Sequence, residues 1–101
     1  MFYKIISVCH TGADGDRWSP REDGLYPNRV GRVVEFDAEA HRNSLDPIVL
    51  NYVMDSDGGM YEGALITSRL VNYDSWDLDH VLIETEREIY ELERCDVDDG
   101  E

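Results

Sequence analysis

The sequence predicts a mainly β fold, either a small, strongly bent sheet or a partly open barrel of five or six strands. Three observations predict it. Several short runs are rich in β-branched and aromatic residues, turn-forming residues separate these runs, and glycines lie inside two of them. Glycine inside a strand often marks the bend or bulge by which a sheet closes on itself. A length of 101 residues with 42% apolar residues fits one compact domain.

The amino-terminal part is predicted to be a strand followed by a long loop. Residues 2–9 are mostly β-branched and aromatic, and their alternation places Phe2, Ile6 and Val8 on one face. The loop covers residues 12–28, because glycines and prolines recur through this segment and interrupt both helix and sheet. A loop of this length in a compact domain is either functional or disordered.

Three further strands are predicted in the middle of the chain. Residues 29–36 form the second strand, with a bend at Gly31. Residues 48–54 and 60–71 form the third and fourth strands. The turn between them contains Asp-Gly and Gly-Gly, which reach positive backbone angles easily, so these two strands make the best-defined hairpin in the sequence.

The segment over residues 78–94 admits two interpretations. As a helix, its apolar residues recur at spacings of three, four and seven, and the fold is then α+β, a sheet of four strands with a C-terminal helix. As a hairpin, residues 81–85 pair with residues 88–92 across Glu86 and Arg87. The hairpin is favoured, because a bent sheet of four strands needs further strands to cover its edges.

The distribution of charged and apolar residues bears on the expected domain organisation and cellular location. Residues 1–95 are predicted to form one globular domain, and residues 96–101 an acidic, flexible tail. The chain has 23 acidic against 9 basic residues and a net charge of −14, which disfavours direct binding to nucleic acid or to an anionic membrane. It shows no apolar run long enough to span a bilayer and no signal-peptide pattern, so a soluble, cytoplasmic protein is predicted.

No catalytic residue, metal site or cofactor is predicted. Cys9 and Cys95 are expected to be free thiols, since two cysteines are too few for a disulfide framework. The turn that begins at Asp55 starts like a calcium loop but lacks the later ligands. The loop from His10 to Asp16 gathers a histidine, a hydroxyl and carboxylates after a strand, and it is the alternative site for a small ligand or a hydrolytic reaction.

Two sets of residues are candidates for binding a partner protein. In the hairpin interpretation, glutamates line one face at roughly phosphate-like intervals, since strand residues two apart are separated by about 6.6–6.8 Å. The long loop and the segment after it interleave arginines with aromatic residues, a pattern that taken alone suits stacking on phosphates or bases. Because acidic residues lie between them, these arginines are expected either to pair with the protein's own acids or to form one pole of a dipolar surface that recognises a partner protein. The predicted partner-binding residues are Glu84, Glu86, Glu88, Glu91 and Glu93 of the hairpin, together with Trp18, Tyr26 and Arg29.

Three short segments carry a resemblance to known proteins. Ser-Val-Cys-His-Thr-Gly at 7–12, Leu-Tyr-Pro-Asn-Arg-Val-Gly-Arg at 25–32 and Leu-Ile-Thr-Ser-Arg-Leu at 65–70 resemble small uncharacterised proteins of bacteria and their phages. In size, acidity and lack of a catalytic motif, the chain is similar to phage-encoded anti-CRISPR and anti-restriction inhibitors, many of which imitate nucleic acid. The resemblance implies a viral origin, and so a location in the host cytosol, with a host nuclease or effector as target. It assigns no site residue.

The sequence thus predicts a non-enzymatic, acidic binding protein, an inhibitor of the anti-CRISPR or anti-restriction type. Its carboxylate-rich face is expected to dock on a basic groove of a host protein that handles nucleic acid, with Coulomb attraction speeding association. The alternatives are a small ligand-binding or hydrolytic barrel that uses the loop from His10 to Asp16, and a structural or assembly subunit whose acidity serves solubility alone.

Overall fold

Seven strands and one short helix are present in the part of the chain that the computed structural model describes, residues 1–12, 16–38, 45–75 and 78–96. The mainly β prediction is confirmed, with seven strands in place of five or six. The elements in chain order are β1 (Phe2–His10), α1 (Tyr26–Arg29), β2 (Val33–Glu35), β3 (Val49–Met54), β4 (Ala64–Ile66), β5 (Asn72–Ser75), β6 (His80–Glu84) and β7 (Glu88–Cys95).

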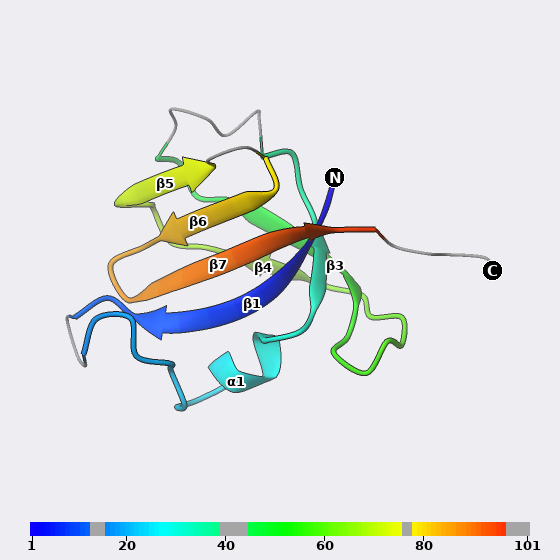
Figure 1. Ribbon diagram of the computed structural model, residues 1–101, viewed down its shortest axis with the longest axis horizontal. Helices are drawn as coiled ribbons and strands as arrows, with labels where there is room; N and C mark the ends of the chain where they lie inside the picture. The colour runs from blue at the N-terminus through cyan, green and yellow to red at the C-terminus, as the bar shows by residue number, and fades with distance from the viewer. Residues whose placement is uncertain (13–15, 39–44, 76–77, 97–101) are drawn as a thin grey trace.

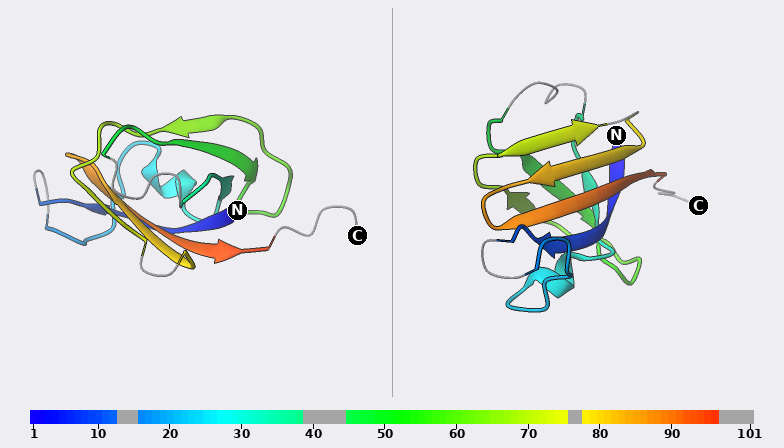
Figure 2. Two further views of the ribbon diagram at one scale, coloured as in Figure 1. Left: turned by 90° about the horizontal axis from the view of Figure 1, so that it is seen from above. Right: turned by 60° about the vertical axis from the view of Figure 1, so that its left-hand side comes forward.

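The seven strands form one antiparallel sheet with the order β4-β3-β2-β1-β7-β6-β5. Figure 1 shows β5, β6 and β7 in front of β3 and β4, and the view from above in Figure 2 shows that the sheet folds over into two layers. β4 and β5 stand at the two ends of the strand order, so the sheet is strongly bent but not closed. This is the partly open architecture that the sequence predicts, although Gly31 and Gly63 lie just before β2 and β4 and not within these strands.

The segment over residues 78–94 is a hairpin, which is the interpretation that the sequence favours. β6 and β7 pair in an antiparallel register with Glu84 opposite Ile89, and the N–H of Thr85 donates to the carbonyl of Glu88 at 2.9 Å across the turn. The alternative α+β fold with a C-terminal helix is therefore wrong. The physical reason is that β7 lies between β1 and β6, where its backbone groups bond to a strand on each side.

The first and last strands pair with each other. The pairing runs from Phe2 opposite Cys95 to His10 opposite Glu88, so β1 and β7 lie side by side in the interior of the sheet. Figure 1 shows the two strands crossing the molecule together. The remaining strands are attached on either side of this pair.

A bulge at Ile6 determines which side chains of β1 face the core. The register between β1 and β7 shifts by one residue after Ile5, which leaves Ile6 as the extra residue. Tyr3, Ile5 and Val8 are buried, each 2% exposed or less, whereas Ile6 is half-buried on the other face. The prediction that Phe2, Ile6 and Val8 share one face is wrong, because the alternation of a strand does not continue unchanged through a bulge.

The core fills the space between the two layers of the bent sheet. Burying one aliphatic or aromatic side chain completely contributes about 1.5–3 kcal/mol, so these residues supply most of the stability. Half-buried Tyr26 of α1 and Tyr73 of β5 pack against the core from outside. The buried members on the strands are Tyr3, Ile5, Val8, Val34, Leu50, Leu65, Val81, Ile83, Tyr90 and Leu92.

The predicted loop over residues 12–28 is fastened to β1. The N–H of Arg21 donates to the carbonyl of Val8 at 2.9 Å, and the end of the loop forms the first turn of α1. α1 also occupies the start of the strand predicted over residues 29–36, so that strand is shortened to the three residues of β2. No helix within the described residues is long and apolar enough to cross a membrane.

Replacing Gly31 with alanine is expected to reduce stability more than the same change at Gly58. Both glycines have positive φ angles, +92° and +88°, so both substitutions carry a backbone cost of about 1–2 kcal/mol. At Gly31 the new Cβ would also meet the Cβ of Ser56 at 2.9 Å, and such overpacking costs about 1–3 kcal/mol more. Urea denaturation measures the difference, and equal free energies of unfolding would contradict the close approach of these two segments.

Candidate functional site

The hairpin of β6 and β7 divides the predicted glutamates between the two faces of the sheet. Successive strand residues point to opposite faces, and Glu84 lies opposite Ile89. The outer face, which points away from the core, therefore carries Glu84, Glu91 and Glu93. Glu88 lies on the inner face. The prediction of one outward row of carboxylates is wrong, because the turn changes the phase of the alternation between the two strands.

Glu88 is a buried carboxylate, 7% exposed. The hydroxyls of Tyr26 and Tyr90 donate to it at 3.2 and 3.5 Å, and Nη1 of Arg29 donates to the hydroxyl oxygen of Tyr90 at 2.6 Å. Burial raises the pKa of both tyrosines, and the nearby carboxylate of Glu88 raises each pKa further. The predicted anchors Tyr26 and Arg29 are half-buried and hold α1 against the sheet.

Arg21 is a second buried charge near α1, with 8% of its surface exposed. Its Nε and Nη2 donate to the carboxylate of Asp23 at 3.1 and 2.7 Å, and its Nη1 donates to the carbonyl of Arg87 at 2.7 Å. The guanidinium also lies 4.4 Å from the ring centre of Tyr26. The hydrogen bonds from Arg21 hold the pKa of Asp23 below its usual range. The guanidinium of Arg21 is therefore bound within the fold.

Glu84 is 7% exposed, because Arg17 binds its carboxylate through two hydrogen bonds of 2.7 and 2.9 Å. Since β7 lies between β1 and β6, this ion pair connects the loop after β1 to a strand two places away. The bond to Glu84 raises the pKa of Arg17. Trp18 follows Arg17 in the loop and is 48% exposed, so it remains an accessible anchor. The expectation that Glu84 faces solvent is wrong.

Three carboxylates form what we call the outer acidic face: Asp74 of β5, and Glu91 and Glu93 of β7. Asp74 lies opposite Leu82, which itself lies opposite Glu91, so the three carboxylates share one side of the sheet. Glu93 is exposed, and half-buried Glu91 accepts a hydrogen bond of 3.2 Å from the hydroxyl of Ser7. Sequence reasoning missed Asp74, because only the pairing of β5 with β6 brings it to this face.

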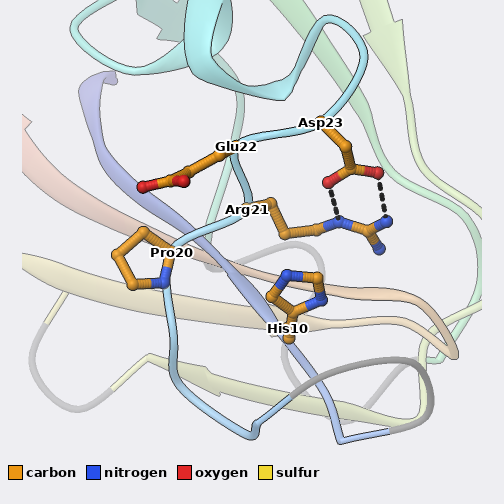
Figure 3. Close-up of a pocket in the computed structure, with 5 residues that line it drawn as sticks. All are labelled: His10, Pro20, Arg21, Glu22 and Asp23. Atoms are coloured by element: carbon orange, nitrogen blue, oxygen red, sulfur yellow. Dashed lines mark hydrogen bonds and ion pairs between the residues drawn. The ribbon is translucent and has the colours of Figure 1, made fainter.

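An open pocket of about 450 Å³ lies at the beginning of the alternative site. Figure 3 shows that the guanidinium of Arg21 turns toward Asp23, so its charge is engaged within the protein. Of the predicted loop, His10 lines this pocket, and Asp14 lies outside the described residues. Among the residues that the structure describes, no group of three or more His, Cys, Asp or Glu side chains is placed to hold a metal ion. The pocket is lined by His10, Pro20, Arg21, Glu22 and Asp23.

The turn after β3 uses its first carboxylate to hold Arg32. The backbone N–H of Ser56 donates to Oδ1 of Asp55 at 2.7 Å, and Nε of Arg32 donates to the same oxygen at 3.2 Å. These two interactions lower the pKa of Asp55. The guanidinium of Arg32 also lies over the rings of Tyr52 and Tyr61, 5.1 and 4.3 Å from their centres. Arg32 thus fastens the β3–β4 hairpin to the segment before β2.

Cys9 and Cys95 are free thiols, as predicted. Cys9 is buried with Leu82 and Ile89 in a small cluster. Cys95 is half-buried, and this burial raises the pKa of its thiol. Cys95 is therefore the more accessible of the two thiols.

Glu88→Ala is expected to lower the free energy of unfolding by about 1–3 kcal/mol, because two tyrosine hydroxyls lose their buried acceptor. Glu86 lies exposed in the β6–β7 turn, and Glu86→Ala is the matched control, with an expected change within about 0.5 kcal/mol. Urea denaturation at pH 7 compares the two variants. Similar losses at both positions would mean that Glu88 does not hold the tyrosines as described.

Asp55→Asn is expected to reduce stability at neutral pH but not in acid. Because the fold lowers the pKa of Asp55, the carboxylate stabilises the protein above the unfolded-state pKa of about 3.9. This contribution is lost as the pH falls through the still lower folded-state pKa. The difference in melting temperature between wild type and variant should be positive at pH 7 and shrink toward pH 3. A difference that persists unchanged at pH 3 would not come from the charge.

No protein-family model matches the chain, and its comparison with curated proteins and with solved structures gives no match. Function is therefore inferred from the contacts, burial and charges of the chain's own residues.

Proposed function

We propose that the chain is a non-enzymatic binding protein that docks its outer acidic face on a basic groove of a protein that handles nucleic acid. The distribution of charge supports this function. Arg17, Arg21 and Arg32 each bind a carboxylate of the protein itself, so these positive charges are neutralised within the fold. The outer acidic face keeps its carboxylates directed outward on a chain whose net charge is −14.

The sheet gives these carboxylates fixed intervals. Glu91 and Glu93 are two residues apart on one strand, which separates them by about 6.6–6.8 Å. Asp74 lies two strands away from Glu91, and neighbouring strands are about 4.7–4.9 Å apart. A two-dimensional array on a hydrogen-bonded sheet presents its charge to a basic groove without having to become ordered first.

A partner with such a groove uses it to bind nucleic acid, so docking would exclude nucleic acid by direct competition. Inhibition of a host nuclease or effector, as in phage-encoded anti-CRISPR and anti-restriction proteins, is the specific form that we propose. The exposed ring of Trp18 offers an aromatic contact on the loop that follows β1. Attraction between opposite charges would speed association, and salt would slow it.

The double variant Glu91→Gln/Glu93→Gln is expected to associate about tenfold more slowly with its partner at low salt. Glu22→Gln/Glu62→Gln is the matched control, because it removes the same charge from two exposed positions elsewhere and should change the rate by less than about twofold. The partner is captured from a bacterial lysate on the immobilised full chain and released with excess duplex DNA. Association rates of the purified partner are then measured at two salt concentrations.

Two results would contradict the proposed function. Equal association rates for the two double variants would mean that binding responds to net charge and not to the outer acidic face. A captured protein that duplex DNA does not release would not be using its nucleic-acid groove.

A further inference from the structure

We propose that the partner inserts one apolar side chain, flanked by basic residues, into a pair of depressions beside Lys4 on the outer face of the sheet. This inference rests on the proposed function and deepens it, because it supplies the apolar anchor that the outer acidic face lacks. The proposal rests on the strand register and on the residues that line and border the depressions.

The first depression lies over β1 and β7, and the second extends from these two strands across β2 to the end of β3. One has a volume of about 260 Å³, and the other about 270 Å³. Each is large enough for the end of a side chain and too small for a drug-sized ligand, whose pockets start at about 300 Å³. The lining includes Ile6 and Glu93 in the first depression, Val33 and Met54 in the second, and Lys4 and Cys95 in both.

The strand register explains why these residues meet on the outer face. Met54 lies opposite Val33, Val33 opposite Lys4, and Lys4 opposite Glu93, which makes one row across four strands. Ile6 lies two residues after Lys4 and therefore shares this side, and the bulge at Ile6 returns Val8 to the core. Since Glu93 belongs both to this row and to the outer acidic face, the depressions continue that face.

Apolar side chains form part of the lining of both depressions. Ile6, Met54 and Cys95 are half-buried, so part of their apolar surface still contacts water. Val33, which lines the second depression, is 6% exposed. Methionine adapts its shape to different neighbours, which suits an anchoring site. A partner side chain that covers this surface would gain the apolar burial that charge pairs alone do not provide.

The charged rim indicates the partner. Glu93 and Asp96 border the depressions, whereas the third carboxylate, that of Asp55, already binds Arg32. Arg94, which also lines the first depression, forms an ion pair of 3.5 Å with Asp79. Basic residues on either side of the apolar anchor would meet the first two carboxylates. Lys4 is exposed and lines both depressions, so its ammonium group can donate a hydrogen bond to a backbone carbonyl of the docked segment.

A second copy of the chain fits this surface less well than a basic segment does. In a two-fold contact the same patch meets itself, so the rim carboxylates of one copy would face those of the other. With a net charge of −14 on each copy, this contact is repulsive. A basic partner turns the same charges into attraction.

Two blocked pentapeptides of equal charge test the anchor. One has a leucine between two pairs of arginines, and the other has a serine in that place. In NMR titrations of the full chain, the leucine peptide is expected to bind about tenfold more tightly and to shift the amide signals around Lys4. It should also slow the alkylation of Cys95 by iodoacetamide, with buried Cys9 as the internal reference. Equal affinities of the two peptides would overturn the anchor.

Two variants locate the binding. Met54→Asn is expected to remove the preference for leucine, whereas Ile66→Asn, at an exposed apolar position of β4, should keep it. A leucine preference that survives Met54→Asn would overturn the location. If Met54→Asn does not fold, the protection of Cys95 in the wild-type chain decides instead, and its absence overturns the proposal. Because the two peptides carry equal charge, their comparison is independent of the result with the glutamine double variants.

Discussion

The pairing of β1 with β7 is the constraint on which the rest of the structure depends. It joins the two ends of the chain in the interior of the sheet, with β2, β3 and β4 attached on one side and β6 and β5 on the other. The ladder fixes the register of every neighbouring strand, and the bulge at Ile6 then sets which side chains of β1 fill the core. Because the same register also places Lys4 opposite Glu93, the packing of the core and the outer surface are determined together.

Buried charges act as ties between segments that are distant in the sequence. Glu84 binds Arg17 of the loop after β1, and Glu88 accepts the hydroxyls that hold α1 in place. A buried carboxylate without such partners would be strongly destabilising, so each of these glutamates needs its contacts. Such pairs neutralise basic side chains within the fold, and the excess carboxylates lie on the surface. The proposed docking function and its apolar anchor both arise from this division between internal and external charge.

Local composition is sufficient to predict the fold class. The arrangement of the candidate site depends on contacts between residues that are distant in the sequence. The turn after β3 and the β-branched runs act over a few residues, which is why the sequence predicts most of the strands. The strand predicted over residues 60–71 is reduced to the three residues of β4, and β5 is not predicted. The β6–β7 hairpin follows from the need for partner strands. The face on which each glutamate lies depends on the phase across the β6–β7 turn, which alternation within one strand does not reveal. The partner of Glu84 is 67 residues away, and Asp74 joins the outer acidic face only through β5. No local pattern marks either contact.

Native-state hydrogen exchange tests the central claim, that the β1–β7 pair holds the two halves of the sheet together. Amides bonded between β1 and β7 are expected to exchange only through global unfolding, with a free energy of opening equal to the free energy of unfolding from urea denaturation. Amides of β4 and β5, at the two ends of the strand order, should exchange through smaller, local openings. Exchange that is faster in the β1–β7 pair than in β4 or β5 would contradict the claim.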